Sequence, residues 1–372
     1  MKILFRVFLS SIIFSLLSAC SLPLNPRKPT PAASSPTTSP PSAVTTALPP
    51  NPFGFFVGKP NQAVNAKVIQ PLKDIGNVGW VRLNVDMGVK GQDYTPYLAA
   101  GFNVILTIVN QDPNNIVTDY GTPKDYPAAG FPFKQKDLYQ QDVRTLLQPS
   151  LTYLKQGRQV WVQAENEETD ATVEKNALYW RGTDQQYLAE SQAFYQAVKS
   201  VSPNIQVVLT SIASYMLDYL INTTLANSAY GVKHVTLLLT EAKFDAIDLH
   251  FYGCVEDIPV KIKAIKTLIP PGQPATWIST ENGGPDFRCK STPTTWKQNL
   301  AQFEQMEAAQ LPVRLTACRQ NGGSICLWFS FYDLTNASDT FSHFGVVNLD
   351  ANLLEKKPAY AAYQVFIQKQ QD

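Results

Sequence analysis

From residue 51 onward, short apolar segments rich in β-branched and aromatic residues alternate with longer amphipathic segments. The apolar segments predict eight strands, at Phe53–Val57, Trp80–Val85, Val104–Val109, Val160–Ala164, Val207–Thr210, Ala246–Phe251, Thr276–Thr280 and Ile325–Phe329. Apolar positions at helical spacing lie between them, most clearly at Gln135–Gln156 and Asp184–Ser200. Strands that alternate with helices form parallel sheets with crossover helices. Eight such units in one domain predict a (β/α)8 barrel.

An open, doubly wound α/β sheet is the alternative fold. The turn after the first predicted strand has neither a GxGxxG nor a P-loop pattern. This absence disfavours a nucleotide-binding sheet.

The first 50 residues differ in composition from the rest of the chain. Lys2 and Arg6 precede a short apolar segment, Val7–Leu17, and this arrangement is typical of an export signal. The segment ends in Leu17-Ser18-Ala19-Cys20, which resembles the lipobox of bacterial lipoproteins, where the Cys is acylated and becomes the first mature residue. An incidental Cys behind an ordinary signal peptide is the alternative.

Nine prolines lie between Leu22 and Pro50, among Ser, Thr and Ala residues. Such a segment has no means of forming a core and predicts a semi-extended spacer. We therefore expect a lipoprotein signal peptide at residues 1–19, a lipid-anchored linker at 20–50 and one barrel domain at 51–372. The anchor at Cys20 would hold the protein to a membrane of a bacterial cell envelope, with the barrel extracytoplasmic, in the periplasm or on the cell surface.

Composition narrows the range of ligands. The chain has 31 Lys and Arg residues against 30 Asp and Glu, a net charge of +1, so no charge excess indicates nucleic acid. Only 16% of the residues are charged while 11% are aromatic, which suits an uncharged, ring-shaped ligand. With 3 histidines and no CxxC or Cys/His ligand spacing, we expect no metal and no other cofactor. We also expect a monomer.

Two glutamates directly follow predicted strands. Glu167 lies in Gln163-Ala164-Glu165-Asn166-Glu167-Glu168, and Glu281 lies in Ser279-Thr280-Glu281-Asn282-Gly283. In a barrel, the carboxyl ends of the strands form one face, where the chemistry takes place. Two carboxyl groups across such a face can cleave a glycosidic bond, because one protonates the leaving oxygen while the other attacks or stabilises the anomeric carbon. Solvated acids at strand ends are the alternative.

Several motifs in this order resemble the large clan of (β/α)8-barrel retaining glycosidases that includes cellulases, mannanases and β-xylosidases. The resemblance covers about Phe53 to the C-terminus. It implies that Glu167 is the acid/base and Glu281 the nucleophile. It further implies substrate-binding roles for Arg82 on strand two, Asn166 on strand four, His250 and Tyr252 on strand six, and Trp328 on strand eight.

The acidic segment departs from the clan, in which Pro or a similar turn residue usually follows the Asn-Glu pair. The choice among Glu165, Glu167 and Glu168 therefore stays open. Each supporting residue also has an alternative: Arg82 in a structural ion pair, and His250, Tyr252 and Trp328 in the core. Three further aromatic residues are equally consistent with outer sugar subsites and with loop packing: Tyr179, Trp180 and Tyr332.

Four cysteines remain in the predicted barrel, Cys254, Cys289, Cys318 and Cys326, and four thiols allow three pairings. Export permits disulfides, and loop proximity favours Cys254–Cys289 and Cys318–Cys326. Free buried thiols are the alternative.

We thus expect a retaining glycoside hydrolase that acts on an extracytoplasmic oligo- or polysaccharide, with Glu167 and Glu281 about 5–5.5 Å apart rather than the roughly 6.5–9.5 Å of an inverting pair. The alternative is a catalytically silent barrel that binds glycans or a partner in the cell envelope. A lyase or esterase is less consistent with the sequence, which has no GxSxG motif and no metal cluster.

Overall fold

The computed structural model describes residues 51–372 with the exception of 175–176, 290–294, 335–339, 350–353 and 371–372. The predicted signal peptide, the predicted acylation site Cys20 and the predicted linker lie outside the described residues. Within the described residues, every helix is too short or too polar to cross a bilayer.

Eight parallel strands form a barrel, in the order β5-β4-β3-β2-β1-β8-β7-β6. The strands are β1 (Phe53–Gly58), β2 (Trp80–Asp86), β3 (Asn103–Val109), β4 (Val160–Ala164), β5 (Gln206–Val208), β6 (Ile247–Phe251), β7 (Trp277–Asn282) and β8 (Cys326–Trp328). Isolated bridges, Val208 to Ala246 and Ile212 to Leu249, join the two end strands β5 and β6. The predicted (β/α)8 barrel is confirmed, and each predicted strand overlaps an observed one.

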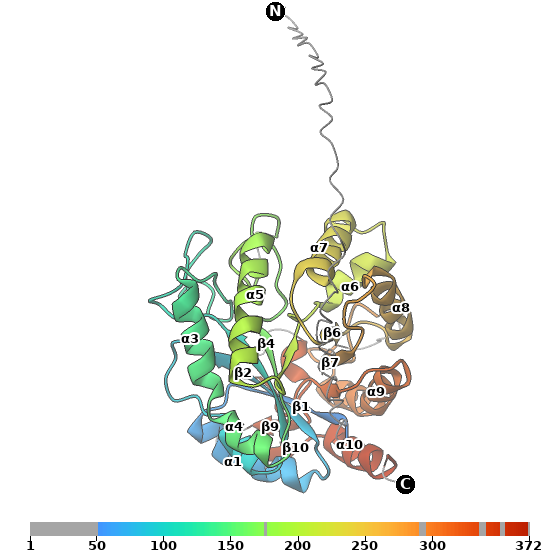
Figure 1. Ribbon diagram of the computed structural model, residues 1–372. Coiled ribbons are helices and arrows are strands. Elements are labelled where there is room, and N and C mark those ends of the chain that lie inside the picture. The colour runs from blue at the N-terminus through green and yellow to red at the C-terminus, as the bar shows by residue number, and fades with distance from the viewer. Residues whose placement is uncertain (1–50, 175–176, 290–294, 335–339, 350–353, 371–372) are drawn as a thin grey trace, which may run out of the picture. The chain divides into compact units, whose positions relative to one another are not determined.

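Helices surround these strands (Figure 1). They are α1 (Gln62–Asp74), α2 (Thr95–Ala99), α3 (Lys136–Leu147), α4 (Ser150–Lys155), α5 (Asp184–Val201), α6 (Ser214–Ile221), α7 (Ser228–Glu241), α8 (Ile258–Leu268), α9 (Leu300–Gln320) and α10 (Pro358–Gln368). A small antiparallel hairpin, β9 (Val347–Leu349) and β10 (Leu354–Lys356), precedes α10.

One predicted helical segment is interrupted. The segment Gln135–Gln156 is not a single helix, because α3 ends at Leu147 and α4 begins at Ser150. Pro149 lies between the two helices, and a proline lacks the backbone N–H that a continuing helix needs and disfavours the helical conformation of the residue before it. The apolar periodicity continues across the break, which is why the sequence pattern shows one continuous segment.

The two faces of the strands belong to different cores. One cluster of buried residues lines the inside of the barrel: Trp80, Ile105, Trp161, Val208, Ala246, Ile278, Ile325 and Leu327. The neighbouring strand residues, such as Val81 and Val104, belong to the larger cluster that includes the helices. Because successive strand residues point to opposite faces, the inward set continues along each strand toward the barrel mouth. This alternation determines which side chains reach the site.

Both predicted disulfides are present. Cys254–Cys289 joins the segments that follow β6 and β7, with a Cα–Cα distance of 4.8 Å, and Cys318–Cys326 joins α9 to β8, with a Cα–Cα distance of 6.1 Å. The alternative of free thiols is therefore wrong for these four residues.

The two disulfides should differ in their contribution to stability. Cys254–Cys289 closes 35 residues and Cys318–Cys326 only 8, and a longer closed loop restricts the unfolded chain more. Replacing both members of a pair by Ser should lower the free energy of unfolding by about 4 kcal/mol for the first and about 2–3 kcal/mol for the second. Urea unfolding of the oxidised protein and the two double variants measures this, and an equal or reversed order would contradict it.

Candidate active site

Arg82 forms the centre of a polar cluster in the barrel mouth. It lies two residues after the inward-facing Trp80 on β2, so its side chain also points inward, and it is fully buried. Its guanidinium donates hydrogen bonds to Thr107 Oγ1 at 2.9 Å, to Asn166 Oδ1 at 2.5 Å and to Glu281 Oε1 at 2.5 Å. A buried cation requires such partners, and here they connect β2 to β3, to the end of β4 and to β7.

Glu281 reaches the cluster through an irregularity in β7. Asp248 pairs with Ile278 but His250 pairs with Glu281, so β7 contains one more residue than β6 over this interval. A bulge of this kind re-aims the side chains that follow it. Glu281 is 8% exposed, and Tyr252 Oη donates to its Oε2 at 2.6 Å while Arg82 donates to its Oε1. Donors on both oxygens suit an ionised carboxylate, which only accepts hydrogen bonds.

Glu167 enters from the other side of the mouth, after β4. Its backbone is left-handed, with φ of 42°, and its Oε1 lies 2.7 Å from His250 Nδ1. One carboxyl oxygen of Glu167, one ring nitrogen of His250 and one carboxyl oxygen of Glu281 all lie within 4.8 Å of one another. An oxygen of each carboxyl group is therefore no more than 4.8 Å from an oxygen of the other, near the spacing of about 5–5.5 Å in retaining pairs and below the roughly 6.5–9.5 Å of inverting pairs.

His250 lies between the two carboxyl groups and a third acid. Its Nδ1 lies 3.3 Å from Glu281 Oε2, and its Nε2 lies 3.1 Å from Thr280 Oγ1 and 3.5 Å from Asp248 Oδ2. Burial alone would lower the pKa of His250, but the charges of Glu281 and Asp248 and hydrogen bonds to Asp248 and Glu167 raise it to about 10. The imidazole is thus a cation at neutral pH.

Asp248 is a site residue that the sequence analysis missed. Burial would raise its pKa, but His250, Arg82 and a hydrogen bond from Thr280 lower it overall, so this carboxylate is charged. Ser211 Oγ also donates to Asp248 Oδ2, at 2.7 Å, and itself accepts from Gln163. A signal was available: Asp248 lies two residues before His250 in an apolar strand, and such positions share a face.

The two acids that flank Asn166 and Glu167 point away from this cluster. Glu165 is fully buried and accepts from the backbone N–H of Asn110, while Glu168 lies beside His234 of α7. Burial raises the pKa of Glu168 to about 8, although the His234 charge opposes this shift. Of the three acids among which the sequence left the choice open, Glu167 is the one that faces Glu281.

Trp328 does not contribute to the mouth, contrary to the prediction. Leu327 points into the barrel, so Trp328 points toward the helices, where it is fully buried and its indole N–H donates to the carbonyl of Phe344 at 2.8 Å. The next residue, Phe329, points back toward the mouth. Its ring stacks on Phe56 at 4.9 Å and lies edge-on to Tyr252 at 6.1 Å. Phe329, which is 7% exposed, is therefore the aromatic residue at the end of β8 that lies next to Tyr252.

The three further aromatic candidates differ in their exposure. Trp180 is fully buried in the main core, so loop packing is correct for it. Tyr179 and Tyr332 are partly exposed, and burial raises the pKa of Tyr332 to about 12. Burial and the Glu281 charge raise the pKa of Tyr252, and Tyr179 lies near enough to add to this shift.

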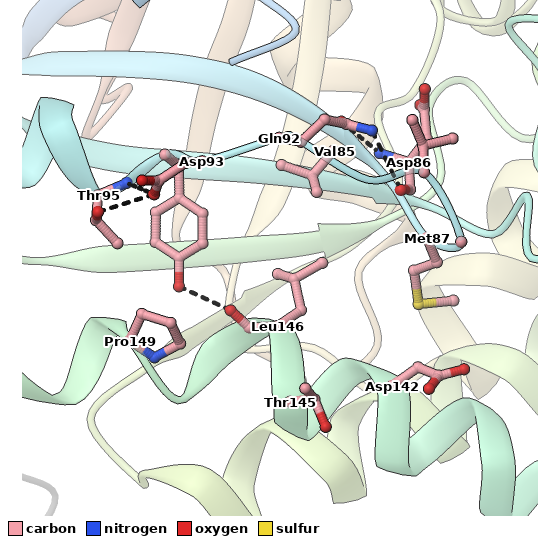
Figure 2. Close-up of a pocket in the computed structure, with 13 residues that line it drawn as sticks. Val85, Asp86, Met87, Gln92, Asp93, Thr95, Asp142, Thr145, Leu146 and Pro149 are labelled. Atoms are coloured by element: carbon pink, nitrogen blue, oxygen red, sulfur yellow. Dashed lines mark hydrogen bonds between the residues drawn. The ribbon is translucent and has the colours of Figure 1, made fainter. Parts of the chain in front are cut away.

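A separate cavity of about 330 Å³ lies between the segment after β2 and helix α3 (Figure 2). Asp142, Thr145 and Leu146 border it on α3. Tyr94 also lines it, and the Tyr94 hydroxyl donates to the Leu146 carbonyl at 2.9 Å. Asp86, at the end of β2, lies on its wall and forms an ion pair with Lys59. None of the residues around Arg82 line this cavity, so it is distinct from the carboxylate site.

No protein-family model matches the sequence, and no curated protein is significantly similar to it. Solved structures match its fold. An exo-β-1,4-mannosidase from Opitutaceae bacterium strain TAV5 superposes with a TM-score of 0.54 at 16% identity, over 86% of this chain and 59% of the mannosidase. A thermostable mutant of a xylanase from Cellvibrio japonicus gives 0.53 at 14% identity, over 86% of this chain and 98% of the xylanase.

A glucosidase from Croceicoccus marinus gives a TM-score of 0.51 at 13% identity, over 82% of this chain and 63% of the glucosidase. The chain thus spans less than two thirds of the mannosidase and of the glucosidase. It shares the barrel fold of these glycoside hydrolases.

The charge of His250 is testable without any substrate. Its pKa is raised above the ordinary value of about 6.5, so the native state binds the imidazole proton more tightly than the unfolded state does. The stabilisation is complete below about pH 6.5 and is lost as the pH rises toward 10. NMR of the histidine rings should show a residue that titrates near pH 10 and disappears in His250→Gln. A His250 resonance that titrates between pH 6 and 7 would contradict this.

Proposed function

We propose that the protein is a retaining glycoside hydrolase in which Glu281 is the nucleophile and Glu167 the acid/base. The observation that carries this proposal is the approach of the two carboxyl groups to within 4.8 Å in the mouth of a barrel. The shared fold of the mannosidase, the xylanase and the glucosidase supports it. The substrate is a carbohydrate, and the low charge of the chain favours a neutral one.

The reaction has two steps. Glu281 attacks the anomeric carbon and forms a glycosyl ester while the bond to the leaving oxygen breaks, and that oxygen takes the proton of Glu167. Glu167, now a carboxylate, then removes a proton from a water molecule that attacks the anomeric carbon and releases Glu281. Arg82 and Tyr252 donate to Glu281 and orient it for attack.

The charges of the cluster agree with these roles. Arg82 and His250 supply two positive charges, and Asp248 and Glu281 supply two negative charges when both are ionised. Glu167 is the fifth ionisable group in contact with this set. His250 Nδ1, 2.7 Å from Glu167 Oε1, therefore lies where it stabilises the carboxylate that Glu167 becomes after the first step.

Substitution of either glutamate should affect a different step. Glu281→Ala should reduce kcat by on the order of 10⁴-fold or more, because no ester forms. Azide should restore turnover of an activated aryl glycoside and yield a glycosyl azide of inverted configuration. Glu167→Ala should lower kcat/KM for poor leaving groups by about 10²–10⁴-fold and for good leaving groups much less, since only poor ones need the proton in the first step.

Wild-type protein is first screened with aryl β-glycosides and with plant, fungal and bacterial polysaccharides, using the soluble fragment from Asn51. Carbohydrate binding without turnover in all of them would favour the catalytically silent barrel instead.

Phe329 should contribute to substrate binding and Trp328 should not. An aromatic face packs against the C–H face of a sugar, and Phe329 is the residue that reaches the mouth. Phe329→Ala should raise KM about 10-fold or more, which corresponds to the loss of an apolar contact of 1–3 kcal/mol. Trp328→Phe is the matched control: it should lower the melting temperature and leave KM unchanged. The reverse pattern would indicate that Trp328, and not Phe329, contacts the sugar.

We also propose that the protein is anchored to a membrane of a bacterial cell envelope through Cys20, with the barrel extracytoplasmic. The lipobox-like Leu17-Ser18-Ala19-Cys20 and the proline-rich segment after it support this location. Cys20→Ala should move the protein from the membrane fraction to the soluble fraction without changing its activity. An intact mass with an unacylated N-terminus at another residue would contradict the anchor.

A further inference from the structure

The acidic segment Glu165-Asn166-Glu167-Glu168 contains a buried carboxyl group two residues before Glu167. Glu165 is fully buried, and its backbone is left-handed, with φ of 63°, as is that of Glu167. Non-glycine residues disfavour this conformation, and it persists only where the surroundings enforce it. What holds the Glu165 side chain therefore also determines the direction in which Glu167 leaves the strand.

The Glu165 carboxyl group fits tightly against the neighbouring loops. Its Oε1 accepts from Asn110 N at 2.8 Å. Its Oε2 would lie only 1.5 Å from a Cβ on Gly130, so the carboxyl occupies the space that a side chain there would need. Gly130 in turn accepts from Arg181 N and donates to the Tyr179 carbonyl, both at 2.9 Å. The carboxyl group thus fixes the segment after β3 against the segment after β4.

Glu190 on α5 completes this contact. It is fully buried and accepts from Tyr139 Oη on α3 at 3.2 Å. Its carboxyl group lies beside that of Glu165, and the buried Oε2 atoms of both groups have no donor among the described residues. Two carboxylates have no donor between them, so a hydrogen bond between the two groups requires one proton. Burial raises the pKa of both groups, and the Glu165 charge raises that of Glu190 further.

The other titratable groups that face this pair do not supply a cation. They are Asp86 at the end of β2, Tyr139 on α3, Tyr187 on α5 and Glu168 after β4, which is itself paired with His234. In the described ranges, the ion pairs that form do not include Glu165 or Glu190. A proton is the positive charge available to hold the two carboxyl groups together.

We propose that Glu165 and Glu190 share one proton and act together as positioning residues that direct Glu167 toward the leaving oxygen. This inference rests on the proposed function of Glu167. The hydrogen bonds of the two side chains in the described ranges go to Asn110 and Tyr139 and not to the residues around Arg82. Their effect passes through the left-handed turn between β4 and Glu167.

Leaving-group dependence distinguishes positioning from a merely structural role. Glu165→Ala removes the anchor of the turn, so kcat/KM for poor leaving groups should fall about 10–100-fold, the cost of a small misplacement of a catalytic group. The kcat/KM of activated aryl glycosides, whose first step does not need the proton, should change less than about 3-fold. Glu307→Gln is the control, because Glu307 is an equally buried acid on α9, paired with Lys357, and it should change both substrate classes equally.

Glutamine variants test the shared proton and keep the shape of the pair. In Glu190→Gln an amide N–H can donate to Glu165 at every pH, so the pair no longer loses its bond when the proton leaves. In the wild type, kcat for poor leaving groups should fall as alkaline pH removes the proton, and Glu190→Gln should move this alkaline limb to higher pH. An unchanged limb, or equal losses for both substrate classes in Glu165→Ala, would overturn the proposal.

Stability provides a readout that does not depend on the proposed function. The native pair retains a proton that the unfolded carboxyl groups lose above their ordinary pKa of about 4.3, so unfolding becomes easier as the pH rises from about 5 toward the pKa of the native pair. The melting temperature of the wild type should therefore fall relative to that of Glu190→Gln over this interval. Parallel curves would disprove the shared proton even if no glycoside is hydrolysed. If the melting temperatures diverge as expected but no glycoside is hydrolysed, the shared proton stands and the proposed function is disproved.

Discussion

The buried guanidinium of Arg82 is the constraint on which the rest of the site depends. A charge that cannot leave the protein interior must be balanced and hydrogen bonded there, and Arg82 achieves this with Thr107, Asn166 and Glu281. These partners come from three other strands or strand ends, so one cation fixes the relative positions of both halves of the barrel mouth. The carboxylate of Glu281 is thus a structural partner as well as the proposed nucleophile.

Regular alternation brings most of the polar cluster together, and two departures from it bring the carboxyl pair together. Along β6, Ala246, Asp248, His250 and Tyr252 share the inward face. Glu281 joins them through the extra residue in β7, and Glu167 joins them through the left-handed turn after β4. Irregular backbone at these two positions therefore brings the carboxyl groups within reach of each other.

Burial acts differently on the acids of this half of the barrel. Asp248 stays charged because His250 and Arg82 are close, whereas Glu165, Glu168 and Glu190 have raised pKa values because burial outweighs their partners. Carboxyl groups in the same half of the barrel thus differ in their tendency to be charged. The acids outside the mouth are buried in the wall that carries Glu167, and the acids inside it are available for chemistry.

The sequence alone determined the fold, both disulfide pairs and the two strand ends that carry Glu167 and Glu281. These follow from local signals: the alternation of strands and helices, the proximity of loops at one barrel face, and acids directly after apolar segments. It also contained the signal for Phe329 and Asp248, because both follow from alternation along a strand. The resemblance to the glycosidase clan, which has a Trp on strand eight, led to Trp328 instead.

Only the tertiary structure decided which of the three acids after β4 faces Glu281. One inserted residue reverses the face of every side chain that follows it, and neither the bulge in β7 nor the left-handed φ of Glu165 and Glu167 has a glycine to mark it. The contact of Glu165 with Glu190 joins residues that are distant in the sequence, and both side chains are buried only in the folded protein. Such conformations are imposed by packing between distant segments, which local sequence does not encode.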